Sequence, residues 1–307
     1  MSSRERRNLK LQIIVIPAII LIAVYLYYPI YQTLYSSLFD IQNFNYQNKD
    51  YVGLRNYKDL FDDPIFWRAL KNTTAMTAAT IFIQLPIAYL LADALANHLR
   101  KRHRRLETLL LFLLFIPIAL PTPVYAKSWR LFFSGSQGGI FPWVTQKLGA
   151  DAAIKQILGT RSVYLLGEPS IAIWVIIGVQ TWARIGFNLL IYRSAILSIP
   201  VEIYESADLD GAGSWAKLFR ITVPITREII SVTIVLAILG VFQLFDIVWM
   251  MTSKGGPLNT THLLATYMYL RAFEDLRPGY GAAIAMTILV VSVSLSLIQL
   301  RVFRARE

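Results

Sequence analysis

Three polar side chains recur at helical spacing within one long apolar segment. Gln180, Arg184 and Asn188 stand at positions i, i+4 and i+8, so they share one face of a helix. Trp182 and Phe187 lie close to them along the chain. Amides and aromatic rings suit a hydroxyl-rich, uncharged ligand. The same groups also serve as hydrogen bonds between helices, with Arg184 paired to a carboxylate or a carbonyl, and the residue types alone leave both interpretations open.

A second pair of polar residues lies in a later apolar segment. Gln243 and Asp246 are three positions apart, which places them on one face if that segment is helical. Polar groups are costly in lipid, so they usually face a cavity. We therefore expect the two faces to line one ligand path between the helices. For Asp246, near the outer end of its segment, a structural pair with a basic group is the favoured interpretation.

Segment 200–224 combines acids, small residues and prolines. Pro200 suits the first turn of a short helix, and Glu205 lies near the positive N-terminal end of that helix. The dipeptide Asp210-Gly211 predicts a stop and a tight turn, after which Ser214 is expected to cap a second short helix. Such a surface suits docking into a cleft of another protein. An amphipathic connector that rests on lipid headgroups is the alternative.

Several kinds of catalytic and metal chemistry have no residues to support them. The chain has no cysteine, which removes thiolate nucleophiles and cysteine-based metal sites. It has no G-x-x-x-x-G-K-[ST] loop for nucleotide phosphates and no serine nucleophile elbow. His98, His103 and His262 have no H-E-x-x-H context. We expect a non-enzymatic chain that holds no metal or cofactor of its own.

The composition indicates where these residues must be placed. Of 307 residues, 55% are apolar and only 16% are charged, yet the net charge is +11. A soluble domain carries about 25% charged residues, and so apolar a chain is neither disordered nor a typical soluble nucleic-acid binder. A polytopic helical membrane protein with its positive excess in the loops fits all three numbers.

Six apolar runs are long enough to cross the hydrocarbon core, which takes about 20 residues as a helix. Pro17, Pro86, Pro117 and Gly240 interrupt these runs, as neighbouring helices in a packed bundle allow. The runs predict an all-α protein with six membrane-spanning helices, at about 11–30, 75–95, 108–126, 171–195, 229–251 and 281–300.

The basic residues indicate which loops are cytoplasmic. Loops 1–10, 96–107, 196–228 and 301–307 hold 15 Lys and Arg in 62 positions, against 13 in 117 positions for the opposite loops. Cytoplasmic loops are enriched in positive charge, so both termini are expected on that side. The run 100–105 is interpreted as an anchor to anionic lipid rather than as a nucleic-acid site. We expect a tail at 1–10, a single membrane domain of six helices at 11–300 and a tail at 301–307.

Segment 200–224 resembles the EAA loop of ABC importer permeases. The residues that carry the resemblance are Glu205-x-Ala207-x-x-Asp210-Gly211-Ala212 and Phe219-x-Ile221-x-x-Pro224. Other pieces resemble the carbohydrate branch of that family, in particular its maltose-type first permease subunit, and together they cover nearly the whole chain. These pieces are Gly53-Leu54-x-Asn56-Tyr57, Trp182, Gly186-Phe187, Ile199-Pro200, Phe245-Asp246, Thr252-x-x-Gly255-Gly256-Pro257, Thr260 and Gly279-Tyr280-Gly281.

The resemblance implies a type I ABC importer permease in a prokaryotic cell membrane, forming half of a sugar path. A second permease subunit, two ATPase subunits that bind ATP and Mg, and an extracytoplasmic substrate-binding protein would complete the transporter. The residues that would seat the EAA loop in the ATPase are Glu205, Ala207, Asp210, Gly211 and Ala212. Those that would line the sugar path are Gln180, Trp182, Arg184, Asn188, Gln243 and Asp246.

Three other interpretations stay open. The cargo of such an importer could be a non-sugar or an anion such as glycerol-phosphate, in which case Arg184 and Arg193 could serve the anionic group. A secondary transporter would need internal repeats around a midplane site, and the six runs show no such symmetry. A membrane scaffold without transport activity is the third.

Overall fold

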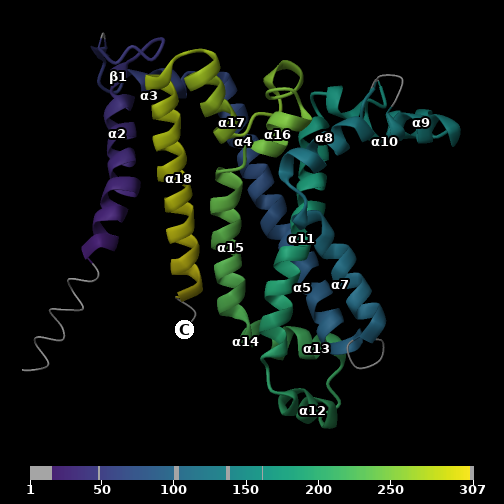
Figure 1. The fold of residues 1–307 in the computed structure, drawn as a ribbon. Helices are drawn as coiled ribbons and strands as arrows, with labels where there is room; N and C mark the ends of the chain where they lie inside the picture. Colours follow the sequence, from purple (N-terminus) through teal and green to yellow (C-terminus); the bar gives the residue numbers. More distant parts are fainter. Residues whose placement is uncertain (1–15, 48, 100–103, 136–138, 161, 305–307) are drawn as a thin grey trace, which may run out of the picture. The chain divides into compact units, whose positions relative to one another are not determined.

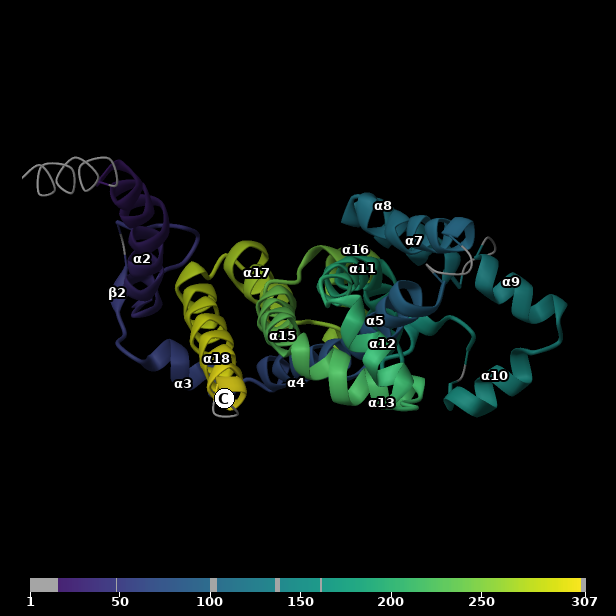
Figure 2. The same cartoon turned by 90° about the horizontal axis from the view of Figure 1, so that it is seen from below.

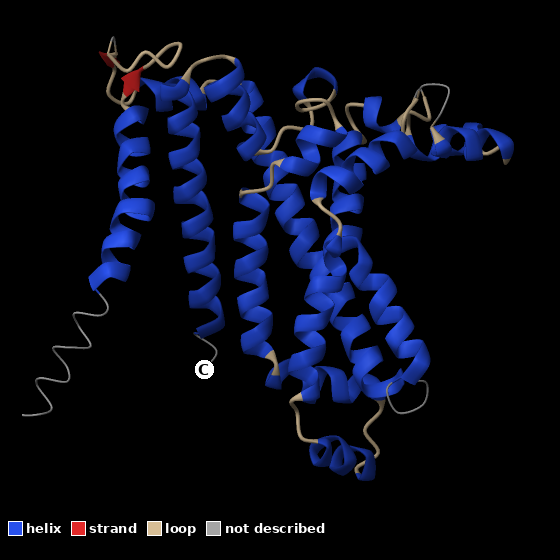
Figure 3. Cartoon of the chain, viewed as in Figure 1, coloured by secondary structure: helices blue, strands red, loops and turns tan. Residues whose placement is uncertain are grey.

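The computed structural model describes residues 16–47, 49–99, 104–135, 139–160 and 162–304. The expected tail 1–10, residues 11–15 of the first run, residues 100–103 of the basic run and residues 305–307 lie outside this range. The described chain is helical apart from its loops and two short antiparallel strands, β1 (Phe39–Asp40) and β2 (Asp50–Tyr51) (Figure 3). It divides into two compact units, Met1–Pro64 with Met268–Leu289, and Ile65–Tyr267 with Val290–Glu307.

Four single helices are long and apolar enough to cross a membrane. They are Ile16–Ser37, Pro64–Asn97, Ala172–Leu197 and Pro278–Phe303. By the same length and composition, two bent pairs count as further spans, Arg105–Ala119 with Thr122–Phe132 and Ser214–Ile225 with Arg227–Phe242. All six predicted runs fall on these segments. The third run changes direction within its bent pair, and the fifth continues beyond Phe242.

The third and fifth runs were wrongly expected to be single helices. The third consists of α7 (Arg104–Ala119) and α8 (Thr122–Phe132), with a bend of 98° between their axes. Pro121 precedes α8 with an extended ψ of 136°, so the chain leaves the direction of α7 there. The fifth consists of α15 (Arg227–Phe242) and α16 (Asp246–Met251). Gly240, expected as an interruption, lies inside α15.

In the first unit, a buried amide fixes the end of the first membrane helix. That helix contains the π-turn η1 (Ala23–Tyr27) and α2 (Tyr28–Ser37), and α3 (Arg55–Phe61) follows the strands. Asn56 Nδ2 donates hydrogen bonds to the carbonyls of Ser37 and Phe39, at 2.9 and 3.0 Å. The Tyr57 hydroxyl lies 2.7 Å from the Ser37 hydroxyl. These bonds give the Gly-Leu-x-Asn-Tyr piece a structural role, because they satisfy backbone groups that the helix end leaves open.

A charged cluster joins two other parts of the same unit. The π-turn η7 (Leu270–Glu274) precedes α18 (Pro278–Arg304). The Asp63 carboxylate accepts hydrogen bonds from Arg271 Nη2 at 3.3 Å and from the Tyr280 hydroxyl at 3.0 Å. Arg271 also donates to Asp275 at 2.8 Å. Tyr280, in the Gly-Tyr-Gly piece, thus has a structural partner as well.

In the second unit, α11 (Ala172–Leu197) runs through the middle of a helix bundle (Figure 1). It packs against α5 (Leu85–Asp93), α7, α15 and α16. The chain reaches α5 through α4 (Pro64–Ala79) and the π-turn η2 (Thr80–Gln84), and leaves it through the π-turn η3 (Ala94–Leu99). Two hydrophobic clusters form the core, one around Met76 and Ile176, the other around Leu85 and Leu189.

Shorter elements lie at the two ends of this bundle (Figure 1). One end carries α8 and α16, with α9 (Ile140–Lys147), α10 (Asp151–Leu158), η4 (Leu165–Gly167), η6 (Pro257–Asn259) and α17 (Leu264–Tyr269) in the connecting segments. Asn72 Nδ2 holds the 252–263 loop there through the carbonyls of Thr260 and His262, at 2.7 and 3.0 Å. The opposite end carries α12 (Val201–Leu209), α13 (Ser214–Lys217), the π-turn η5 (Leu218–Thr222) and α14 (Val223–Ile225), and this end faces the viewer in Figure 2, which is seen from below.

Candidate functional site

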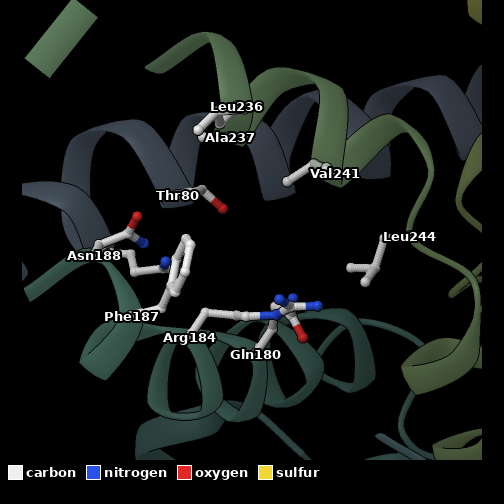
Figure 4. A pocket seen from close by; sticks show the side chains of 11 residues that line it. Thr80, Gln180, Arg184, Phe187, Asn188, Leu236, Ala237, Val241 and Leu244 are labelled. Carbon is white, nitrogen blue, oxygen red and sulfur yellow. The ribbon is translucent and has the colours of Figure 1, made fainter. Parts of the chain in front are cut away.

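A polar pocket lies half-way along α11, between that helix, η2 and α15. Its volume is about 140 Å³. Gln180, Arg184 and Asn188 project into it from α11, as their spacing predicted, and Thr80 faces them from η2 (Figure 4). Arg184 is near the centre of the 26-residue α11, so the pocket lies at the middle of a membrane span. Its other lining residues are Gln84, Phe187, Leu236, Ala237, Gly240, Val241 and Leu244.

The amide of Gln180 has an unsatisfied acceptor in this pocket. The residue is 7% exposed, and within the described chain its Oε1 atom is buried and has no hydrogen-bond partner. A buried acceptor without a partner costs about 1–3 kcal/mol. Thr80, in contrast, donates its hydroxyl to the Met76 carbonyl at 2.9 Å. A ligand hydroxyl that reached Gln180 would remove the cost of its unpaired oxygen, so the pocket is better suited to binding than to closing on itself.

The two arginines of α11 have different surroundings. Arg193 forms an ion pair with the buried Glu107 of α7, and its Nε donates to the Glu107 Oε1 at 3.1 Å. That pair gives Arg193 a structural role between α7 and α11. Arg184 is exposed toward the pocket and has no ion pair or hydrogen bond with any residue that the structure describes. The pocket therefore contains one full positive charge.

Three predicted path residues lie away from this pocket. Trp182 is two positions from Gln180, which puts it on another side of the helix, and its ring contacts those of Tyr125 and Trp129, at 6.3 and 5.3 Å between centroids. Gln243 and Asp246 were wrongly expected on one helical face, since α15 ends at Phe242 and α16 starts at Asp246. Both are exposed, and neither lines the pocket.

Gln84 and Gly240 are among the pocket residues that the sequence reasoning missed, as is Thr80. Gln84 is buried (3% exposed) and lines the pocket from η2. The signal was present, because Gln84 is a polar residue between Ile83 and Leu85 in the second apolar run, and such residues are expensive in a membrane. Gly240 lines the opposite wall, where a Cβ atom would meet nothing within 4 Å. No pattern in the sequence distinguishes this glycine from a helix break.

The EAA loop (200–224) forms two short helices joined by a tight corner. At the end of α12, the Ala212 N–H donates to the Ala207 carbonyl at 2.9 Å and the Gly211 N–H to the Asp208 carbonyl at 3.1 Å. These two bonds are those of a Schellman motif, which needs a left-handed residue after the cap. Gly211 supplies it with a φ of +74°, as predicted. The second helix is capped by Gly213, and Ser214 is its first residue, so the expected Ser214 cap is wrong.

Contacts within the EAA loop fix the corner, while its outer surface is open. Lys217 forms an ion pair with Asp208, which ties α13 to α12. The Tyr204 hydroxyl lies 3.0 Å from the Thr222 hydroxyl and ties α12 to η5. Ala207 is buried, whereas Glu205, Asp210 and Gly211 are exposed and Ala212 is half-buried. At the corner Leu209 is 91% exposed. An apolar side chain so open to water, beside exposed acids, is typical of a surface that a partner protein covers.

The described residues offer no group of three or more His, Asp or Glu side chains that could hold a metal ion. The described residues form a polar pocket in the middle of membrane helices and an exposed loop at one end of the same bundle. The family model of the binding-protein-dependent transport system inner membrane component matches residues 84–306. The chain belongs to this family. The match spans the EAA loop and every pocket residue except Thr80, and it confirms the expected ABC importer permease.

Relatives of this permease have names from the same class of transporter. The chain is 32% identical to the probable ABC transporter permease protein YurN of Bacillus subtilis, over 94% of each protein. It is 31% identical to the lactose transport system permease protein LacF of Rhizobium radiobacter, over 95% of this chain and 93% of the relative. The sulfoquinovosyl glycerol transport system permease protein SmoG of Agrobacterium fabrum is 30% identical, over 95% and 89%.

A solved structure shares the fold of the permease. It is the crystal structure of a bacterial ABC transporter involved in the import of the acidic polysaccharide alginate, with a TM-score of 0.80. The similarity covers 98% of this chain and 96% of the matched chain at 22% sequence identity. The all-α, polytopic fold of a type I ABC importer permease, predicted from the six apolar runs and the EAA loop, is confirmed.

Proposed function

We propose that this permease is the transmembrane subunit of an ATP-driven importer that carries a saccharide. The observation that carries the proposal is the mid-span pocket, where the buried Gln180 has an unsatisfied oxygen and Asn188 adds a second amide. Amide groups and the ring of Phe187 suit a hydroxyl-rich ligand. The transport systems named for LacF and SmoG, lactose and sulfoquinovosyl glycerol, support this class of cargo. One is uncharged and the other is a sulfonate, so the relatives leave the charge of this cargo open.

The permease works with partners in this proposal. A second permease subunit completes the path, and an extracytoplasmic binding protein delivers the saccharide. Two ATPase subunits bind ATP and Mg, because this chain has no phosphate-binding loop of its own and acts as a transport subunit rather than an enzyme. Residues 11–300 form the permease domain, in the cell membrane of a prokaryote. Both termini lie in the cytoplasm, on the side of the EAA loop.

The EAA loop is the proposed contact with the ATPases. Glu205 is exposed on α12 and faces a basic group of the groove. Asp210 and Gly211 form the corner, and Ala207 and Ala212 accept and donate the bond that closes it. Closure of the ATPases on ATP then moves α12 as a rigid body. Trp182, Gln243 and Asp246 stay in the proposal as residues of the outer path, away from the central pocket.

The pocket is tested in the assembled importer, with its own partners, in proteoliposomes. The probes are lactose, maltose, trehalose and sulfoquinovosyl glycerol. With the probe that the wild type accumulates best, Gln180→Ala and Asn188→Ala should each lower uptake at limiting concentration by up to about tenfold, the value of one hydrogen bond. Gln156→Ala, an exposed glutamine of α10, is the matched control. Full uptake by both variants at normal expression would remove the pocket from the path.

The loop is tested separately by the conformation of Gly211. Alanine in a left-handed conformation costs about 1–2 kcal/mol, whereas asparagine tolerates it. A Cβ atom at this position meets nothing within 4 Å, so within this chain only the backbone is affected. Gly211→Ala should weaken probe-stimulated ATPase activity and Gly211→Asn should retain more of it. Wild-type coupling in Gly211→Trp, which adds bulk as well, would contradict the assignment of the loop.

A further inference from the structure

We propose that the saccharide or polyol carried by this permease bears a negative charge, and that Arg184 binds the anionic group. The inference rests on the proposed function and names the class of cargo within it. Its basis is the charge balance of the pocket. Arg184 lines the pocket together with Thr80, Gln84, Gln180 and Asn188, which are all neutral, and no carboxylate is among the residues that line it.

The charge of an arginine at this depth needs compensation. The guanidinium stays protonated at any physiological pH, and a charge near the middle of a membrane span is costly unless it is paired or faces a cavity. Arg184 is at the centre of α11 and opens into the pocket. Within the part of the chain that the structure describes, it has no ion pair. Water, a charged ligand or a group of the second permease subunit must therefore compensate it, and the test below distinguishes the last two.

The same helix shows how the bundle treats an arginine with a structural role. Arg193 lies nine residues further along α11 and is paired with Glu107, which is 4% exposed. Where an arginine only joins two helices, as Arg193 does, the bundle thus provides a buried carboxylate as its partner. Arg184 lies instead in the pocket with amides on both sides of it at one-turn spacing. This difference points to a ligand and not to helix packing.

The chemistry of the groups defines the cargo. A guanidinium binds a carboxylate, sulfonate or phosphate through parallel N–H donors. Gln180 and Asn188, one turn to either side, can hydrogen-bond hydroxyl groups, and Phe187 offers an apolar surface next to them. Together these groups fit an acidic saccharide or an acidic polyol, with its charge at Arg184 and its hydroxyls at the amides.

The test uses the assembled importer with its binding protein in proteoliposomes and three matched pairs of probes. They are glucosyl glycerol with sulfoquinovosyl glycerol, glucosyl glycerol with glucuronosyl glycerol, and glycerol with glycerol 3-phosphate. The pairs distinguish a sulfonate, a carboxylate and a phosphate as the anionic group. Variants are Arg184→Gln, Arg184→Lys and, as a matched control outside the pocket, Arg55→Gln, whose arginine is exposed and paired within α3.

We expect the wild type to prefer the charged member of at least one pair. Arg184→Gln should then lower uptake of that probe at limiting concentration by tenfold or more, about 1.4 kcal/mol, and leave neutral probes unaffected. Arg184→Lys should keep part of the uptake, because it retains the charge without the planar fork. Arg55→Gln should match the wild type.

Two results would overturn the inference and leave the proposed function standing. One is preferred uptake of a neutral probe that Arg184→Gln does not change. The other is an equal loss of charged and neutral uptake in Arg184→Gln together with less assembled complex in size-exclusion chromatography, which would make Arg184 a structural charge paired with a partner subunit. If the wild type accumulates neither these probes nor lactose, maltose or trehalose, the proposed function fails and this inference fails with it.

Discussion

Gly186 lies where α11 passes α7, and an alanine there should force the two helices apart. A Cβ atom at this position would be 2.1 Å from the backbone oxygen of Leu114 and 2.8 Å from its carbonyl carbon. Both atoms belong to the backbone of α7, so no side-chain rotation can relieve the clash. Small residues allow membrane helices to approach this closely. Gly186 belongs to the Gly186-Phe187 piece that resembles the carbohydrate permeases. The close contact with α7 explains why a glycine stands at this position.

The size of the effect follows from the geometry. Real Cβ contacts below 3.0 Å are essentially absent from proteins, so the backbone of α7 or α11 must move by roughly 1 Å, a strain of about 1–3 kcal/mol. Gly178 on the same helix is the matched control, because a Cβ atom there meets nothing within 4 Å. Alanine should be neutral or favourable at Gly178, by up to about 1 kcal/mol.

The assay is thermal unfolding of the purified, assembled importer, followed by tryptophan fluorescence. Gly186→Ala should lower the apparent Tm by roughly 2–10 °C, and Gly178→Ala should leave it unchanged or raise it slightly. Equal melting of the two variants would refute the reasoning, since it would mean that α7 and α11 are not in backbone contact at Gly186. A loss of expression in Gly186→Ala alone would agree with it.

Three further predictions concern pairs and surfaces in the second unit. Glu107→Gln leaves Arg193 without its counter-charge and should cost about 3–5 kcal/mol of stability; the double variant Glu107→Gln with Arg193→Gln should recover much of it, and a Tm equal to that of the single variant would contradict the pairing. Asn72→Ala removes two hydrogen bonds to the 252–263 loop and should lower the Tm and increase proteolysis of that loop, with the exposed Asn45→Ala as control. Gly240→Leu places a Cβ atom where nothing lies within 4 Å and extends the rest of its side chain into the pocket, so it should reduce saccharide uptake at an unchanged Tm, and normal uptake would show that the cargo does not pass this wall.

The straight helix of the bundle was predictable from hydropathy, and the bent ones were not. The fourth run was expected at 171–195 and the helix is Ala172–Leu197, because this run has no proline to bend or end the helix. The third run contains Pro117, and Pro121 and Pro123 follow closely, yet only the structure shows that the chain turns at Pro121. Hydropathy reports transfer into lipid and carries no information on the direction of the backbone.

Whether a helix is unbroken or bent also decides which site residues could be predicted from the sequence. Gln180, Arg184 and Asn188 meet in the pocket because α11 is unbroken, so that their spacing of four residues stays true along it. The pairing of Gln243 with Asp246 failed because three non-helical residues separate α15 from α16. For Gly211, a local rule was sufficient, since the turn that follows Asp210 depends on the backbone of a few neighbours and on no distant contact.

α11 connects the pocket to the EAA loop. The wall of the pocket that α11 forms and the opposite wall are joined to this loop in different ways. From Arg184 to the end of the helix at Leu197 there is no break, a distance of roughly 20 Å at 1.5 Å per residue, and α12 follows after three residues. The opposite wall belongs to α15, which joins the loop through a bend of 72°. A movement that α12 transmits across these three residues therefore reaches Gln180 and Arg184 through one unbroken helix, whereas the bend at Thr226 can absorb the movement before it reaches α15. We expect the walls to shift relative to each other when the loop moves, so that a change at the ATPase contact opens or closes the pocket.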